Sequence, residues 1–109
     1  MGMSINDYQD FARAHAKYED GIFYSAISMF EHAAKIADEI IPVSENENGK
    51  ITDEKKVIII NELGDVFWYL ANVAADLGVS LEIIAQSNLD KINSIEAKAR
   101  IQEAKNNEN

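Results

Sequence analysis

The chain has 109 residues, a hydrophobic fraction of 47%, a formal net charge of -9 and no cysteine. This length predicts a single folded domain, and the acidic charge disfavours duplex nucleic acid, whose phosphates the protein would repel. The lack of cysteine excludes disulfides, thiolate metal sites and cysteine nucleophiles. The first residues do not resemble a signal peptide, and no run approaches the roughly 18 apolar residues of a membrane helix. We therefore expect a cytoplasmic protein with no membrane partner.

Apolar periodicity and capping residues predict four helices. Ser4 suits the N-cap of the first helix, and Gly21 marks the break after it. The second helix is predicted from Ile22 to Ile41, where Pro42 should end it because proline cannot continue the hydrogen-bond ladder. An apolar stripe should turn this helix toward the core, and it consists of Phe23, Ile27, Phe30, Ala34, Ala37 and Ile41.

A polar loop is expected from Val43 to Ile51, followed by a third helix from Thr52 or Asp53 to Leu77. This helix is apolar around most of its circumference, so we expect other helices or a second copy to bury it. Its polar residues fall within roughly 100° of the helical wheel. They are Asn61, Glu62, Asp65, Tyr69, Asn72 and Asp76.

The fourth helix is predicted to begin after a short turn. Gly78 should close the third helix in the left-handed conformation, and Ser80 should cap the fourth. The apolar pattern allows a kink near Ser87 and Asn88. We expect one helical domain over residues 1–104 and a frayed polar tail over residues 105–109.

Glu62 and Asp65 form a compact acidic pair in a largely apolar helix. A spacing of three residues puts both carboxylates on one helix face. Two such carboxylates can coordinate Mg²⁺, which prefers oxygen ligands and commonly also holds substrate phosphates. The spacing alone favours the simpler interpretation of a solvated polar stripe.

The surrounding sequence resembles the MazG-like nucleoside triphosphate pyrophosphohydrolases. The similar segments are Glu62–Asn72, Leu77–Leu81 and Asn88–Lys91, with further similarity upstream at residues 8–12 and 36–40. The resemblance implies an all-α bundle of four to five helices, completed by dimerisation or tetramerisation, with sites often shared between subunits. It also implies Mg²⁺-dependent cleavage of NTPs or dNTPs to the monophosphate and pyrophosphate.

The chain departs from this family at the metal site. The family combines a Glu-x-x-Glu pair on the second helix with a Glu-x-x-Asp pair on the third. Glu62 and Asp65 match the second pair, whereas the first pair aligns with His32 and Lys35. An ammonium group beside the carboxylates would repel Mg²⁺, and imidazole is a poor ligand for so hard an ion. We predict that Lys35 replaces the metal electrostatically and that Mg²⁺-dependent hydrolysis is impaired.

Several further residues are candidates for contact with a nucleotide. Tyr69 could meet a sugar or base, although it also suits a core tyrosine with a wet hydroxyl. Asn88 and Lys91 match a family segment that the resemblance places near the phosphates; independently they are an ordinary exposed pair. The candidate nucleotide-binding residues are His32, Lys35, Glu62, Asp65, Tyr69, Asn88 and Lys91, with Glu62 and Asp65 as ligands if a metal binds.

Three functions remain open on the sequence. The first is a nucleotide-binding protein that has lost hydrolysis and senses, sequesters or regulates, holding phosphate without a metal. The second is an active pyrophosphohydrolase in which His32 favours a softer ion such as Mn²⁺, Co²⁺ or Zn²⁺. The third is a non-catalytic helical interaction module. No cofactor is expected unless activity survives with Mg²⁺ or Mn²⁺, and the expected partners are a small nucleotide and further copies of the chain.

Overall fold

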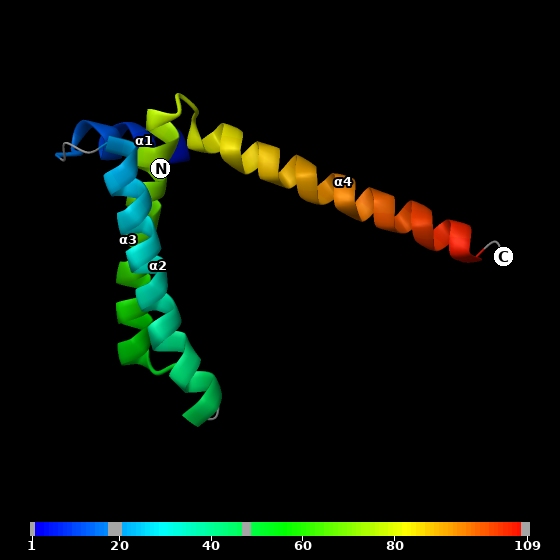
Figure 1. The fold of residues 1–109 in the computed structure, drawn as a ribbon, viewed down its shortest axis with the longest axis horizontal. Helices are drawn as coiled ribbons and strands as arrows, with labels where there is room; N and C mark the ends of the chain where they lie inside the picture. Colours follow the sequence, from blue (N-terminus) through cyan, green and yellow to red (C-terminus); the bar gives the residue numbers. More distant parts are fainter. Residues whose placement is uncertain (1, 18–20, 47–48, 108–109) are drawn as a thin grey trace.

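A computed structural model describes residues 2–17, 21–46 and 49–107, and the prediction of an all-α fold is confirmed in these ranges. Four helices follow one another along the chain (Figure 1). They are α1 (Ile5–Ala14), α2 (Gly21–Asn46), α3 (Asp53–Asp76) and α4 (Leu81–Asn107).

The predicted capping residues Ser4 and Ser80 fix the starts of α1 and α4, and Thr52, predicted only as a possible start of the third helix, caps α3. Ser4, Thr52 and Ser80 each accept a hydrogen bond from the backbone N–H three residues further on, at 3.0, 3.2 and 3.1 Å. Such bonds satisfy donors that have no partner within the first turn of a helix. Gly78 has a φ of 75° after α3, the left-handed conformation that glycine adopts without a steric penalty.

The predicted end of the second helix is wrong, because α2 continues through Pro42 to Asn46. A proline inside a helix removes one backbone hydrogen bond and crowds an earlier carbonyl, at a cost of about 3 kcal/mol. Burial of the apolar side chain of Val43 acts in the opposite direction. The described loop before Thr52 starts at Gly49, whereas the loop was predicted to start at Val43.

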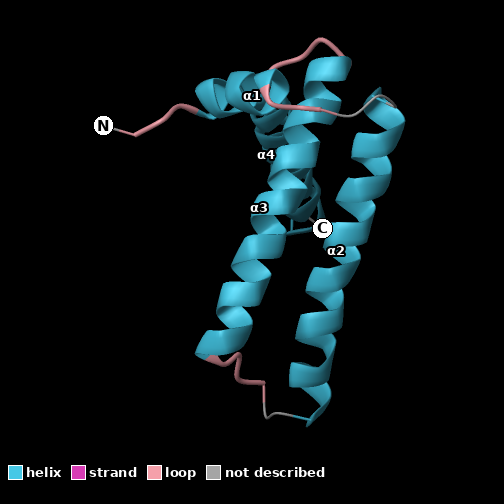
Figure 2. Ribbon diagram, turned by 90° about the vertical axis from the view of Figure 1, so that its left-hand side faces the viewer, coloured by secondary structure: helices cyan, strands magenta, loops and turns pink. Residues whose placement is uncertain are grey.

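The helices α2 and α3 lie side by side as an antiparallel hairpin, and α1 packs across the C-terminal end of α3 (Figures 1 and 2). A small core lies at that end and consists of Ala12, Ala71, Ala74 and Leu81. The end of the predicted polar stripe also turns toward α1. Asn72 is fully buried and donates to the carbonyl of Ala12 at 3.4 Å, and Asp76 pairs with Arg13 at 2.5 Å.

The apolar stripe of α2 points away from α3, contrary to prediction. Phe23 and Phe30 are 76% and 73% exposed, and the other stripe residues are exposed too. The face that meets α3 instead carries Ser28 and His32, which contact Tyr69 and Glu62. These polar contacts fix the rotation of α2, because turning its apolar stripe inward would separate them.

Burial of α3 is likewise smaller than predicted. The buried residues of this helix are Ile59, Ala71, Asn72 and Ala74, three of them at the end that α1 covers. Val57, Ile60 and Leu63 are exposed because α2 covers a single flank of α3. The helices of one chain therefore leave much of α3 uncovered, and its burial by a second copy stays a prediction.

Among the described helices, α3 is long and apolar enough to cross a membrane by length and composition. Core helices of soluble proteins meet the same criteria, so this finding carries little weight. Glu62 and Asp65 lie within α3, and carboxylates are costly in the hydrocarbon region of a bilayer.

The helix α4 leaves the core directly after Leu81 and projects away from the hairpin (Figure 1). Leu81 is buried, whereas every residue from 82 to 107 is exposed. The helix runs without interruption to Asn107, so the kink near Ser87 is absent and residues 105–107 belong to α4. The remaining tail residues, 108 and 109, lie outside the described residues.

Candidate functional site

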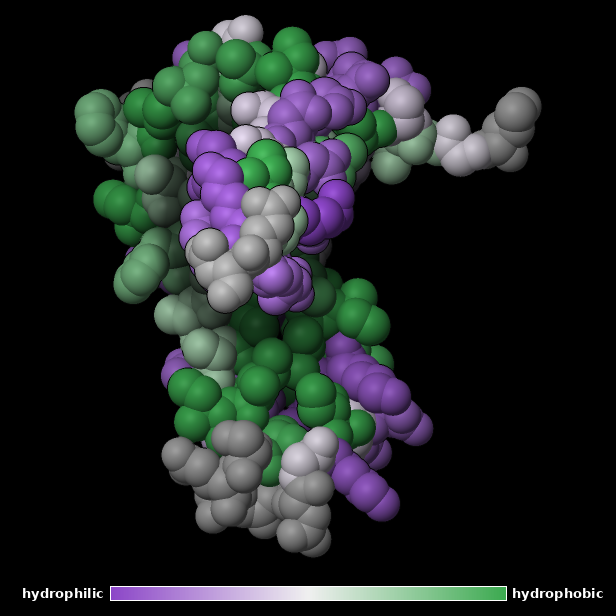
Figure 3. Space-filling view, turned by 90° about the vertical axis from the view of Figure 1, so that its right-hand side faces the viewer, coloured by the Kyte–Doolittle hydropathy of each residue, from purple (hydrophilic) through white to green (hydrophobic). Residues whose placement is uncertain are grey.

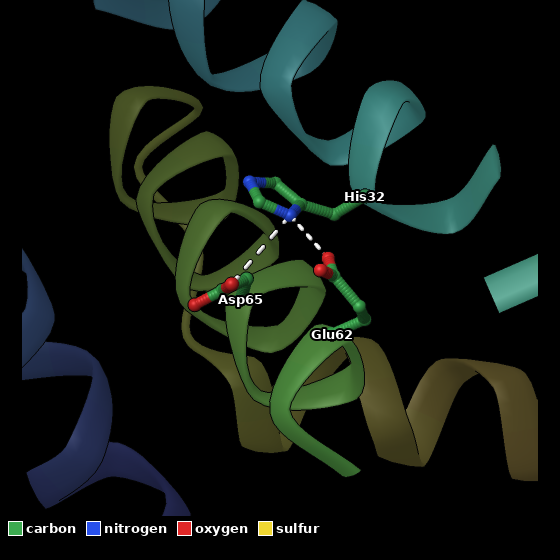
Figure 4. Close-up of side chains that lie close together, drawn as sticks. All are labelled: His32, Glu62 and Asp65. Atoms are coloured by element: carbon green, nitrogen blue, oxygen red, sulfur yellow. Dashed lines mark hydrogen bonds and ion pairs between the residues drawn. The ribbon is translucent and has the colours of Figure 1, made fainter. Parts of the chain in front are cut away.

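His32 meets the acidic pair between α2 and α3, as Figure 4 shows. The spacing of three residues places Glu62 and Asp65 on one face of α3, and His32 approaches them from α2. The Nδ1 atom of His32 lies 2.5 Å from Oε2 of Glu62 and 3.5 Å from Oδ2 of Asp65. The side chains of His32 and Glu62 are each 19% exposed and that of Asp65 is 54% exposed, so water and small solutes can reach the cluster.

Tyr69 extends this cluster by one turn of α3. Its ring is stacked on that of His32, with centroids 5.6 Å apart and an angle of 16° between the planes. Tyr24 of α2 also packs against Tyr69, with the two ring centroids 6.0 Å apart. Burial raises the pKa of Tyr69, and Tyr24 and Asp65 raise it further. Its phenol therefore stays protonated at neutral pH and can donate or accept a hydrogen bond.

Tyr8 brings α1 within the electrostatic reach of the cluster. Burial raises the pKa of Tyr8, and the negative charge of Asp65 raises it further. Its ring centroid lies 4.7 Å from that of Phe67. Neither Tyr8 nor Tyr24 was predicted from the sequence to be a site residue. For Tyr8 a signal existed, because it belongs to the upstream segment that resembles the MazG-like proteins.

Lys35 does not lie beside the carboxylates, where it was predicted to replace a metal ion. Its side chain is exposed, and within the described part of the chain it forms no ion pair with Glu62 or Asp65. Three residues along an α-helix rotate a side chain by about 60° from the starting position, which turns Lys35 toward the outer polar side of α2. The group that contacts the carboxylates is therefore the imidazole of His32 rather than an ammonium group.

The cluster offers three ligand atoms that lie within 4.8 Å of one another, one each from His32, Glu62 and Asp65. This set does not fit the Mg²⁺ centre implied by the resemblance, because Mg²⁺ prefers oxygen ligands in octahedral geometry. One imidazole nitrogen and two carboxylate oxygens suit a borderline ion such as Zn²⁺ or Co²⁺ better. Such an ion would have to displace the hydrogen bond between His32 and Glu62, which engages the same nitrogen.

Asn88 and Lys91 lie on the projecting part of α4 and are exposed. They help to line a shallow hollow of about 420 Å³ together with Val79, Ile83, Ile84 and Ser87. The structure does not bring them to the cluster of the same chain, because α4 extends away from the hairpin (Figure 1). A second hollow, of about 520 Å³, adjoins the cluster on α2 and is lined by Phe23, Tyr24, Ile27, Ser28 and Glu31.

The fold and the site define an all-α protein with a histidine–dicarboxylate cluster between two antiparallel helices. The chain is similar to the Gene 37 protein of Mycobacterium phage L5, with 34% identity over 83 residues that span 76% of this chain and 73% of the phage protein. It belongs to the family of that phage protein. No family profile matches the sequence, and no solved structure matches it.

Proposed function

We propose that this protein is a MazG-like nucleotide-binding protein whose Mg²⁺-dependent hydrolysis is impaired. The observation that carries the proposal is the 2.5 Å contact between Nδ1 of His32 and Glu62. The resemblance implies a metal-ligating carboxylate at position 32. In this chain the imidazole of His32 stands there, and it engages the carboxylate of Glu62 that a metal ion would need as a ligand. The protein would sense or sequester a nucleotide, or serve as a regulatory subunit.

Two further observations support the MazG-like part of the proposal. The structure is all-α, and it places Glu62 and Asp65 on the face of α3 that looks toward position 32 of α2. The resemblance implies the same arrangement, in which the acidic pairs of the second and third helices contribute to one site. The outward apolar stripe of α2 supports the expected completion of the bundle by further copies of the chain.

Phosphate binding without a metal would use hydrogen-bond donors and a positive charge on the α2 side of the cluster. Figure 4 shows that the second ring nitrogen of His32, Nε2, points away from both carboxylates. Because Nδ1 donates to the carboxylate of Glu62, Nε2 can donate a hydrogen bond to a phosphate oxygen only in the protonated ring, which carries an N–H on both nitrogens. Lys35 adds a charge on the exposed side of α2, and local cations of this kind can outweigh a diffuse net charge of -9 at short range. Tyr69 and Tyr24 offer ring faces for the sugar or base.

The proposal is tested by thermal denaturation with a panel of nucleotides in EDTA, in Mg²⁺ and in Mn²⁺. We expect at least one nucleotide to raise the Tm in EDTA, because a ligand at 100 times its Kd stabilises by about 2.7 kcal/mol. Lys35→Ala should reduce the shift and Lys105→Ala, an exposed lysine on α4, should not. If no nucleotide shifts the Tm under any condition, the non-catalytic interaction module is the better account.

A second candidate function is an active pyrophosphohydrolase that uses a softer ion. The three ligand atoms within 4.8 Å of one another favour it, as does the outward position of Lys35. It predicts pyrophosphate release with Mn²⁺, Co²⁺ or Zn²⁺ that Glu62→Gln abolishes and Glu96→Gln, on exposed α4, leaves unchanged. Absence of release with all three ions at saturating nucleotide would exclude this candidate.

A further inference from the structure

We propose that the hollow on the N-terminal half of α2 is a nucleobase site that selects guanine, with the carboxylate of Glu31 as the group that recognises the base. This inference rests on the proposed function, because it names the class of nucleotide that the protein would sense or sequester. The hollow has a volume of about 520 Å³ and is lined by Phe23, Tyr24, Ile27, Ser28 and Glu31. Its volume is typical of sites for small molecules.

The hollow presents exposed aromatic side chains that a flat ligand could cover. Phe23 is 76% exposed and Tyr24 is 42% exposed, and Ile27 beside them is 60% exposed. Nucleobases stack on aromatic side chains, and stacking tolerates any base because every base has a π face. The aromatic part of the lining therefore suits a base without specifying which one.

A carboxylate distinguishes this hollow from the other exposed apolar surface of the chain. Figure 3 shows hydrophobic side chains gathered over the hairpin on the side from which α4 projects, so apolar contact by itself does not mark a site. Glu31 is exposed, and it forms no hydrogen bond or ion pair in the part of the chain that the structure describes. Side chains on a helix lean toward its N-terminus, so Glu31 covers the turn that carries Ile27.

The hydroxyl groups in the lining are already engaged. Tyr24 and Ser28 both form side-chain hydrogen bonds with Tyr69 of α3, and Ser28 is only 7% exposed. Glu31 is therefore the lining residue that is available to recognise a base. An ionised carboxylate accepts hydrogen bonds and cannot donate one. The hollow should accordingly select a base edge that presents donors.

Guanine is the base whose edge fits a single carboxylate. Its ring N–H and its 2-amino group are adjacent donors, which match the two oxygens of Glu31. Adenine and cytosine present an amino group beside a ring nitrogen that acts as an acceptor, and a carboxylate repels this nitrogen. Uracil and thymine present an N–H between two carbonyl oxygens, which a carboxylate also repels. Glu31 therefore favours guanine by attraction and disfavours the other bases by repulsion.

The hollow is connected to the histidine–dicarboxylate cluster by aromatic side chains. Tyr24 lines the hollow and packs against Tyr69, whose ring is stacked on that of His32. A nucleotide with its base in the hollow would have its sugar beside these rings and its phosphates near His32. Glu31 and His32 are consecutive residues of α2, so the contacts that fix the rotation of this helix position both groups.

The test measures binding to the full chain by isothermal titration calorimetry in EDTA. The probes are GTP, ATP and ITP, which differs from GTP by the absence of the 2-amino group. A hydrogen bond to a charged group contributes about a factor of ten or more to an equilibrium constant. We therefore expect the Kd of GTP to be about 10–100 times lower than that of ATP and about 10 times lower than that of ITP.

Glu31→Gln tests the residue itself, because an amide both donates and accepts. XTP carries a carbonyl oxygen in place of the 2-amino group, and the amide of the variant can donate to this oxygen. We expect the variant to prefer XTP to GTP, whereas the wild type should prefer GTP. Asp38→Asn is the matched control, since it removes the same charge from an exposed residue of α2 outside the hollow. It should keep the preference for GTP.

The outcomes separate the guanine site from nucleotide binding as such. Similar Kd values of the wild type for GTP, ITP and ATP, or tighter binding of ATP, would overturn the guanine site and leave the proposed function standing. An unchanged preference for GTP over XTP in Glu31→Gln would overturn the role of Glu31. Absence of binding by every nucleotide would overturn the proposed function and this inference together.

Discussion

At the scale of single residues, His32 distinguishes this cluster from a magnesium centre. Its Nδ1 atom lies 1 Å closer to Glu62 than to Asp65, at 2.5 and 3.5 Å. Hydrogen bonds to a carboxylate are stronger than those between neutral groups, so the contact holds the imidazole ring in place. The stacked ring of Tyr69 restricts it from a second side. His32 is therefore positioned to present Nε2 to a ligand.

Two tyrosines give the protein a specific response to alkaline pH. Burial raises the pKa of both Tyr8 and Tyr69 above the usual value of 10.0, and Asp65 adds to both shifts. A group whose pKa is raised in the folded state contributes stability that is present below its unfolded pKa and is lost as pH rises through its folded pKa. The free energy of unfolding should therefore decline above about pH 10.

Urea unfolding between about pH 8 and about pH 11 measures this decline. The double variant Tyr8→Phe/Tyr69→Phe should show a shallower alkaline decline than the wild type. Asp65→Asn should lower both pKa values toward 10.0 in a spectrophotometric tyrosine titration. An unchanged alkaline slope in the double variant would contradict the burial of these hydroxyls.

The sequence predicted which residues form the cluster better than it predicted their contacts. Glu62 and Asp65 were predictable because a spacing of three within a long helix fixes their common face. Which residue of α2 contacts these carboxylates was not predictable. His32 and Lys35 share one side of α2, and the rotation of that helix decides which of the two faces α3. The contacts of Ser28 and His32 with α3 set this rotation, and they join residues that are distant in sequence.

At the scale of elements, the buried side chain of Gln9 joins α1 to the turn between α3 and α4. Its Nε2 donates to the carbonyls of Val79 at 2.9 Å and Ala71 at 3.4 Å, and its Oε1 accepts from the N–H of Leu81. Gln9→Ala would leave these buried backbone groups without partners, which should lower the free energy of unfolding by about 2–4 kcal/mol.

Gln86→Ala is the matched control, since Gln86 is exposed and bonds to Asp90 within the same helix. We expect a change within about 0.5 kcal/mol for this variant. Chemical denaturation of both variants provides the comparison. Equal effects at the two positions would show that Gln9 does not support the turn.

Helix ends were predicted well where a cap is local and poorly where packing competes with it. Ser4, Thr52, Gly78 and Ser80 act through backbone groups within a few residues, so their effect can be inferred from sequence. Pro42 was expected to end α2, but the chain remains helical to Asn46. The direction of α4 could not be predicted, because it depends on contacts of Asn6 and Gln9 with residues more than 70 positions away.

At the scale of the whole molecule, one chain leaves most of its apolar residues in contact with water. The stripe of α2 has the periodicity of a core face, and that periodicity was identified correctly. What the sequence could not indicate is that the stripe faces outward from its own chain, because a contact with a second copy produces the same pattern as a contact within one chain.

Association should make the Tm depend on concentration, since a dimer is stabilised by mass action. We expect the Tm of the wild type to rise over a hundredfold increase in protein concentration. Differential scanning calorimetry at both concentrations measures the shift. A wild-type Tm that does not respond to concentration would contradict association through the exposed apolar stripe of α2.

The most direct test of the site is to introduce, at His32 and Lys35, the acidic pair that the MazG-like resemblance implies there. Pyrophosphate release from NTPs and dNTPs with Mg²⁺ is measured for the wild type and for His32→Glu/Lys35→Glu. We predict no enzymatic release by the wild type and Mg²⁺-dependent release by the double variant, because the chain would then carry both acidic pairs that the MazG-like resemblance implies for the metal site. Wild-type release with Mg²⁺ at a typical enzymatic rate of about 1 s⁻¹ or more, or a double variant with no response to Mg²⁺, would contradict this account.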